Sequence, residues 1–190
     1  MHQYLYLIPA LPLIGFLVLS LAGKHLHKTF VAWLGAGTVC ASALITIVLG
    51  IEFFQNPPSS GAYAQLLWNW FSAGRLSVSV SFTADALTLV FIFIITFVGA
   101  LIHIFSTAFM RKDRDYARFF ACMNLFVCSM LVLVMADNLV LLYLGWEGVG
   151  LCSYLLIGFW YETPANCRAA NKAFYIPRIG DTAMIIGLFF

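Results

Sequence analysis

The chain consists largely of apolar runs, each long enough to cross a lipid bilayer. A spanning helix needs about 20 predominantly apolar residues. The runs fall near residues 4–22, 30–54, 86–109, 119–136 and 139–160, and a sixth begins around residue 172. Of all residues, 63% are hydrophobic and 9% are charged, whereas soluble domains have about 45–50% apolar and about 25% charged residues. The sequence therefore predicts an all-α polytopic membrane protein, a bundle of about six transmembrane helices.

Composition also excludes several kinds of site. The net charge of +2 is too small to indicate a nucleic-acid partner. The five cysteines form no C-x-x-C pair, and all but Cys167 lie in apolar runs, where a thiol packs as a small hydrophobic group. No phosphate-binding glycine motif and no flavin or nicotinamide fingerprint occurs. We therefore expect no metal site, no bound cofactor and no redox centre in this chain.

Basic residues gather in alternate connections between the apolar runs. They are Lys24 and Lys28 in the first connection, Arg111, Lys112, Arg114 and Arg118 in the third, and Arg168 and Lys172 in the fifth. Connections that are rich in Lys and Arg stay on the cytoplasmic side of a membrane. The sequence therefore predicts that these three connections are cytoplasmic and that the N-terminus lies outside.

The predicted outside connection between the second and third runs is the only long one. Residues 76–82 alternate between apolar and polar side chains, as a strand does, and residues 65–71 are a candidate partner in a short hairpin. We therefore divide the chain into two transmembrane helices (1–54), an external loop (55–84) and helices three to six (85–190). Asp85 and Asp137 stand where helices are expected to begin, so capping is the better explanation for both.

Glu147 is the residue that points most directly to function. At about 1.5 Å per helical residue, it lies within roughly 4 Å of the middle of the run 139–160. A carboxylate at that depth costs on the order of 2.5–3.5 kcal/mol by insertion scales. Gly145, Gly148 and Gly150 let another helix approach closely, so Glu147 is expected to face protein. It is either a structural contact or, as intramembrane carboxylates are by default, a group that holds or moves a proton or cation.

Other titratable groups lie on the third and sixth runs. Arg178 and Asp181 are three residues apart and can meet on one helix face, as a surface ion pair or as a functional pair. Lys172 lies on the opposite face from Asp181. His103 is either a hydrogen-bonded packing residue or a proton relay.

The depth of these cations matters for Glu147. Lys172 and Arg178 are expected near the cytoplasmic interface, roughly 15 Å along the helix axis from the level of Glu147. Glu147 is therefore expected to lack a partner cation within these residues, and an unpaired buried carboxylate takes up a proton.

Several strings, taken together, resemble one family. They lie at residues 82–87, 101–106, 118–121, 137–154 with its Gly145-Trp146-Glu147-Gly148, 172–174 and 178–181. These strings are similar to subunit L of bacterial respiratory complex I, NADH:quinone oxidoreductase, which is called subunit 5 in mitochondria. The resemblance covers essentially the whole chain, which matches the N-terminal third of that family. It therefore implies a longer polypeptide.

The resemblance implies an antiporter-like helix bundle that translocates protons, coupled to NADH oxidation and quinone reduction elsewhere in the complex. It places proton-translocating roles on Glu147, Lys172, Arg178 and Asp181, to which the sequence adds His103. The partners implied are other complex I membrane-arm subunits and the lipid bilayer of a bacterial inner (plasma) membrane. NADH, FMN, iron–sulfur clusters and quinone are expected in partner subunits.

Two other functions remain open from the sequence. The same Glu147 chemistry would serve the large subunit of a multisubunit Na⁺/H⁺ antiporter, and the chain is also compatible with a non-transporting fragment. One departure from the family concerns Pro177, where the family usually has a small polar residue. A proline there removes a backbone donor and is expected to kink the helix around Arg178.

Overall fold

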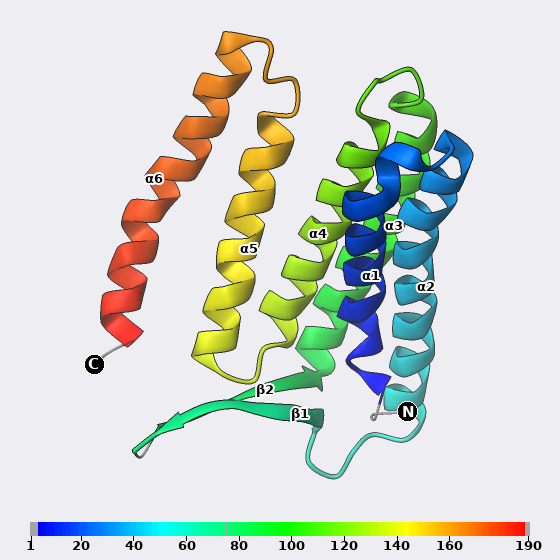
Figure 1. Cartoon of the computed structure of the whole chain (residues 1–190). Helices are drawn as coiled ribbons and strands as arrows, with labels where there is room; N and C mark the ends of the chain where they lie inside the picture. Colours follow the sequence, from blue (N-terminus) through cyan, green and yellow to red (C-terminus); the bar gives the residue numbers. More distant parts are fainter. Residues whose placement is uncertain (1–3, 75, 189–190) are drawn as a thin grey trace.

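The computed structural model describes residues 4–74 and 76–188, which form six α-helices, a short 3₁₀ turn and one β-hairpin (Figure 1). Five helices are long and apolar enough to cross a membrane. They are α1 (Leu7–Ala22), α2 (Lys28–Gln55), α3 (Ala86–Phe109), α4 (Tyr116–Met135) and α5 (Leu139–Ile157). The prediction of a helical, multi-pass membrane protein is confirmed.

The sixth helix, α6 (Pro164–Leu188), begins earlier than the expected residue 172. It has 25 residues, which is roughly 37 Å of helix at 1.5 Å per residue, but its apolar stretch is interrupted by charged residues. The early start has a local cause. Proline is favoured at the first helical position, because its fixed φ suits a helix and its missing N–H has no partner to lose there.

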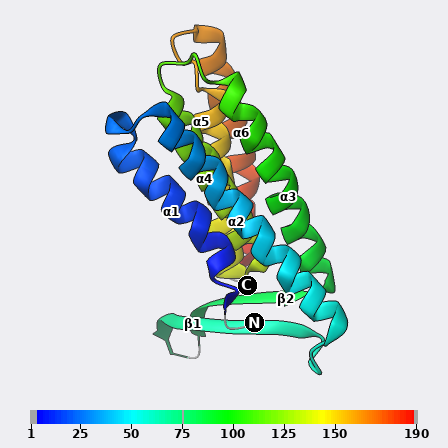
Figure 2. The same ribbon diagram turned by 90° about the vertical axis from the view of Figure 1, so that its right-hand side faces the viewer.

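The helices form a bundle in which α4 packs against α1, α2, α3 and α5, while α6 packs against α5 at the edge (Figures 1 and 2). The largest apolar core lies among α1, α2, α3, α4 and the hairpin. Its fully buried side chains include Ile8, Val39, Ile92, Leu131 and Met135. Because α4 is shared by most of these contacts, it fixes the position of α5, and through α5 the position of α6.

Pro12 lies inside α1 without interrupting the helix. A proline has no N–H, so the carbonyl of Ile8, four residues earlier, loses its helical partner. The buried hydroxyl of Ser42 on α2 donates to this carbonyl over 2.8 Å. A neighbouring helix therefore satisfies the freed backbone group, as a membrane-spanning helix requires.

The hairpin pairs β1 (Ala62–Ala73) with β2 (Leu76–Asp85) in antiparallel register and lies across one end of the bundle (Figures 1 and 2). Residues 65–71 and 76–82 lie within these strands, so the hairpin is longer than the sequence indicated. Ser81 donates to the Asp137 carboxylate over 2.8 Å, and Asn138 donates to the Ser79 carbonyl over 2.8 Å. These bonds attach the hairpin to the connection between α4 and α5.

The two expected helix caps have different outcomes. Asp85 accepts a hydrogen bond from the Thr88 N–H over 2.7 Å and caps α3 as predicted. That bond is the main reason why the pKa of Asp85 lies below its ordinary value. The prediction for Asp137 is wrong, because α5 begins at Leu139 and the residue directly before it is Asn138. Asn138 accepts from the Leu141 N–H over 3.0 Å.

The connections that carry basic residues meet at the end of the bundle opposite the hairpin (Figure 1). Lys28 donates to the carbonyls of Arg111 and Asp113 over 3.0 and 2.8 Å. Trp160 donates to the Asp113 carboxylate over 2.9 Å, and this bond is the main cause that lowers the pKa of Asp113. This clustering of cations at one end is the pattern that the positive-inside rule expects of a cytoplasmic face.

The predicted sidedness can be measured by cysteine labelling. In a background with the five native cysteines replaced by serine, Ser59→Cys in the exposed turn before β1 should react with a membrane-impermeant thiol reagent on intact cells. Lys112→Cys, exposed at the opposite end, should react only after the cells are permeabilised. The reverse labelling pattern would show that the charge bias does not set the orientation of this chain.

Candidate functional site

The face of α5 that packs on α4 includes two glycines, Gly145 and Gly148. A Cβ added at Gly145 would lie 2.5 Å from the backbone nitrogen of Leu133, and one added at Gly148 would lie 2.6 Å from the Ser129 hydroxyl. At Gly145, where the added Cβ would meet the backbone of Leu133, only a residue without a side chain allows this approach. With that face held against α4, the side chain of Glu147 is directed to α6.

Glu147 is contacted from two helices. Tyr143, one turn earlier on α5, donates its hydroxyl to Oε1. The guanidinium of Arg178 on α6 forms an ion pair with Oε2. The side chains of Glu147 and Arg178 are 20% and 36% exposed, so the pair is only partly open. Each carboxylate oxygen thus has its own donor, and charge-assisted bonds of this kind stabilise the charged carboxylate.

The expectation that Glu147 lacks a cation is therefore wrong. It rested on a sixth helix starting around residue 172, which put Arg178 near the cytoplasmic end. The helix begins at Pro164 instead, so Arg178 lies roughly 21 Å along it. Glu147 lies roughly 15 Å from Ile157, where α5 ends on the same side. In two antiparallel helices these depths are close enough for the side chains to meet.

Asp181 also has a different partner from the one expected. Its carboxylate, in a residue only 8% exposed, accepts a hydrogen bond from Trp146 Nε1 over 2.7 Å. Within residues 4–74 and 76–188 the structure shows no ion pair between Arg178 and Asp181, because Arg178 reaches across to Glu147. The guanidinium also lies over the Phe174 ring, 4.5 Å from its centre.

Two further sequence expectations concern α6. The helix continues through Pro177, so the expected kink does not break it and Arg178 remains on the face that meets α5. Lys172 is exposed, and no described contact joins it to Glu147. The structure thus brings Glu147, Arg178 and Asp181 together at the α5–α6 contact and leaves Lys172 apart from them.

His103 lies elsewhere, on the face of α3 that packs against α2 and α4, and it is fully buried. Its Nδ1 is 2.8 Å from the Gly99 carbonyl, which can only accept, so Nδ1 carries the hydrogen. The neutral ring then presents a lone pair at Nε2, which is buried and has no hydrogen-bond partner among the described residues. His103 is therefore a second polar centre, separate from the Glu147 cluster.

Tyr143 is not among the site residues predicted from the sequence, and Trp146 appears there only as the neighbour of Glu147. Tyr143 could have been predicted from its spacing, because it is four residues before Glu147 and residues four apart on a helix share a face. Trp146 could not have been predicted in this way, since its bond to Asp181 depends on how α6 is placed against α5.

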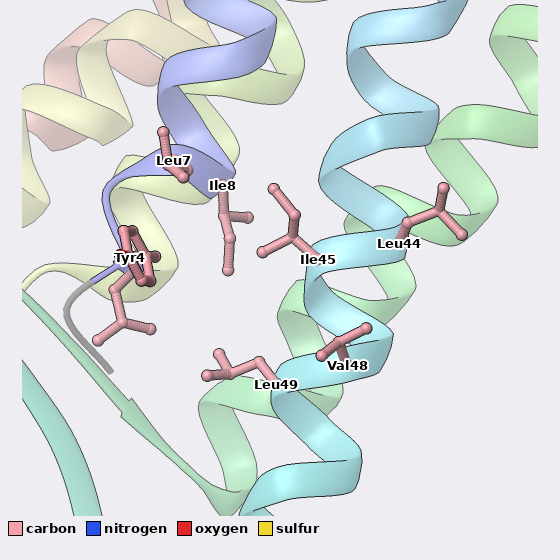
Figure 3. Close-up of a pocket in the computed structure, with 8 residues that line it drawn as sticks. Tyr4, Leu7, Ile8, Leu44, Ile45, Val48 and Leu49 are labelled. Atoms are coloured by element: carbon pink, nitrogen blue, oxygen red, sulfur yellow. The ribbon is translucent and has the colours of Figure 1, made fainter. Parts of the chain in front are cut away.

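An apolar groove of about 410 Å³ lies between the start of α1 and the second half of α2, away from Glu147 (Figure 3). Figure 3 shows Ile8 of α1 facing Ile45 and Leu49 of α2. The described residues that line this groove include no carboxylate, imidazole or amine, so they offer no group suited to proton transfer. Among the described residues, no three His, Cys, Asp or Glu side chains lie close enough to hold a metal ion.

Two protein families match the chain. Residues 70–120 match the family described as NADH-Ubiquinone oxidoreductase (complex I), chain 5 N-terminus. Residues 136–190 match the family described as NADH:quinone oxidoreductase/Mrp antiporter, TM. The second match includes all of α5 and the described part of α6, and thus Glu147, Arg178 and Asp181.

Curated relatives agree with these matches. NADH-quinone oxidoreductase subunit L of Escherichia coli (strain K12) is 47% identical over 94% of this chain, and that of Mycobacterium tuberculosis (strain H37Rv) is 44% identical over 98%. The chloroplastic NAD(P)H-quinone oxidoreductase subunit 5 of Carpenteria californica is 36% identical over 98%. The chain spans 29%, 29% and 25% of the lengths of these three relatives.

Proposed function

Since the chain belongs to the NADH-quinone oxidoreductase subunit L (chain 5) family, we propose that it is part of a proton-translocating subunit of the complex I membrane arm. In this proposal NADH oxidation and quinone reduction take place in partner subunits, which bind NADH, FMN, iron–sulfur clusters and quinone. Its neighbours are other membrane-arm subunits, and its membrane is a bacterial inner membrane with the N-terminus outside.

The observation that supports this proposal most strongly is the Glu147–Arg178 pair between α5 and α6. Two unit charges about 4 Å apart attract by about 4 kcal/mol at an effective dielectric constant of about 20. Each 1.4 kcal/mol changes an equilibrium about tenfold. A shift of Arg178 relative to Glu147 would therefore change the proton occupancy of Glu147 by orders of magnitude, so that withdrawal of the cation loads a proton and its return releases one.

Asp181 and Lys172 have supporting roles in the proposal. Asp181 is a second buried carboxylate three residues from Arg178, and it offers an alternative acceptor for the guanidinium when Glu147 is protonated. Lys172 lies roughly 9 Å of helix from Arg178 toward the predicted cytoplasmic end. An exposed amine there can exchange protons with water.

His103 enters the proposal as a separate proton-holding group, because its buried Nε2 lone pair is open to a proton or to a water hydrogen. We expect His103→Gln, which keeps a hydrogen-bonding side chain but cannot titrate, to lower the proton-to-electron ratio while NADH oxidation continues. His25, whose side chain is exposed at the end of α1, supplies the matched control His25→Gln. An unchanged ratio in His103→Gln would reduce His103 to a packing residue.

The second family description includes Mrp antiporters, so a cation/proton antiporter is the alternative function. The full-length protein in its complex, reconstituted in vesicles, separates the two. We expect NADH oxidation by quinone to acidify one side of the membrane without any sodium gradient. An antiporter would instead move protons in response to an imposed Na⁺ gradient with no NADH present. No proton flux under either condition would leave the non-transporting alternative.

A further inference from the structure

We propose that Tyr143 is a positioning residue that holds the Glu147 carboxylate in its charged form and so sets the pH at which Glu147 exchanges its proton. This inference rests on the proposed function and adds to it a residue outside the charged cluster. It starts from the contact of the Tyr143 hydroxyl with Oε1, the carboxylate oxygen that Arg178 does not occupy.

The hydrogen bond between Tyr143 and Glu147 can have only one donor. An ionised carboxylate can only accept, so the phenol must donate. A hydrogen bond to a charged acceptor is about twice as strong as one between neutral groups. When Glu147 takes up a proton, the charge that strengthens this bond disappears. Tyr143 therefore favours the charged carboxylate, and its hydroxyl contributes to how tightly Glu147 binds a proton.

The two partners of Glu147 differ in whether they can leave. Tyr143 is four residues away on the same helix, so its ring lies on the same face and moves with Glu147. The contact of Gly145 and Gly148 with α4 fixes that helix. Arg178 belongs to α6, which packs on α5 at the edge of the bundle. Tyr143 is thus the permanent donor, and it keeps the carboxylate oriented. Arg178, in contrast, is the partner that a movement of α6 can withdraw.

None of the other groups that neighbouring helices present around Glu147 donates a hydrogen bond to Oε1 in the described part of the chain, so Tyr143 is its donor. On α6, Asp181 is bound to Trp146 and Lys172 is exposed. The face of α4 toward α5 presents Ser129 and the thiols of Cys122 and Cys128, which lie near Cys152. The charged residue of α4, Arg118, is paired with Asp115 at the far end of the helix over 3.0 Å. In the described part of the chain, Tyr143 and Arg178 are the direct donors to the carboxylate.

The test is Tyr143→Phe in the full-length protein within its complex, since this change removes one hydroxyl and keeps the ring. Without the donor, the carboxylate binds its proton more tightly. The acid limb of the pH profile of NADH-driven proton pumping should therefore move to higher pH by about one unit, a tenfold change in proton affinity. A role in packing alone would lower the rate equally at every pH, and that result would overturn the proposal.

Tyr154→Phe on the same helix is the matched control. The Tyr154 ring packs on Phe174 at 5.4 Å between ring centres, and no described hydrogen bond involves its hydroxyl, so its pH profile should not move. A fluorinated tyrosine at position 143, which is a stronger donor, should move the acid limb to lower pH. This second variant tests the proposal even where Tyr143→Phe fails to assemble. An unshifted profile with both variants, beside a Glu147→Gln variant that no longer pumps, would reject the role of Tyr143 and leave the proposed function standing.

Discussion

Glu147→Gln in the full-length protein is expected to remove most proton pumping while the complex still assembles. Glutamine keeps the size of the side chain and can still accept from Tyr143, but it cannot take up a proton. A positioned proton-transfer group typically contributes 10²–10⁴-fold to a rate, so we expect pumping to fall by at least about tenfold. Acidification of reconstituted vesicles, read with a pH-sensitive dye during NADH oxidation, measures this directly.

Two further variants make this result specific. Glu147→Asp should retain more pumping than Glu147→Gln, because the titratable group survives on a shorter side chain. Glu162→Gln is the matched control, since Glu162 is 73% exposed and pairs with Arg114 at the end of the bundle. Normal pumping in Glu147→Gln would reduce Glu147 to a contact that joins α5 and α6.

Arg178→Leu is expected to have the second largest effect, because it leaves Glu147 without its cation. Breaking a buried ion pair by removing one partner costs about 3–5 kcal/mol, and the 36% exposure of Arg178 places this pair below that range. The carboxylate can avoid the remaining cost by taking up a proton. We therefore expect lower thermal stability of the variant and a proton retained on Glu147 at neutral pH.

A double variant separates this effect from a general loss of packing. The double variant Arg178→Leu with Glu147→Gln has no carboxylate at position 147 that could lack a partner cation. Its loss of stability should therefore be smaller than that of Arg178→Leu alone. Lys172→Leu, on the exposed side of α6, should leave thermal stability unchanged. Equal losses in the single and double variants would mean that Arg178 acts through its packing on Phe174 and not through Glu147.

The helices that could be predicted from the sequence are those with a continuous apolar signal. The third run was expected at residues 86–109 and α3 has those bounds, because Asp85 caps its start and polar residues follow its end. The sixth helix was misplaced, because residues 164–172 mix polar and charged residues with small ones and show no long apolar run. The true start is indicated by Thr163, a favoured N-cap residue, followed by Pro164 at the first helical position.

That misplaced start explains the main error at the candidate site. The charged residues themselves were identified from the sequence, and spacing on one helix correctly suggested that Arg178 and Asp181 share a face. Which partner each one takes depends on the depth of α6 against α5, and no pattern within one helix contains that information. For the same reason, the hydrogen bond from Trp146 to Asp181 could not be predicted.

The most direct test of this account is an infrared titration of Glu147 in the full-length protein, with Glu147→Gln as the subtraction control. If Glu147 is a proton site governed by Arg178, the band of its protonated carboxyl should appear only at acidic pH in the native protein. In Arg178→Leu the same band should persist to neutral pH or above. A band that titrates at the same pH with and without Arg178, or that never titrates, would contradict the account.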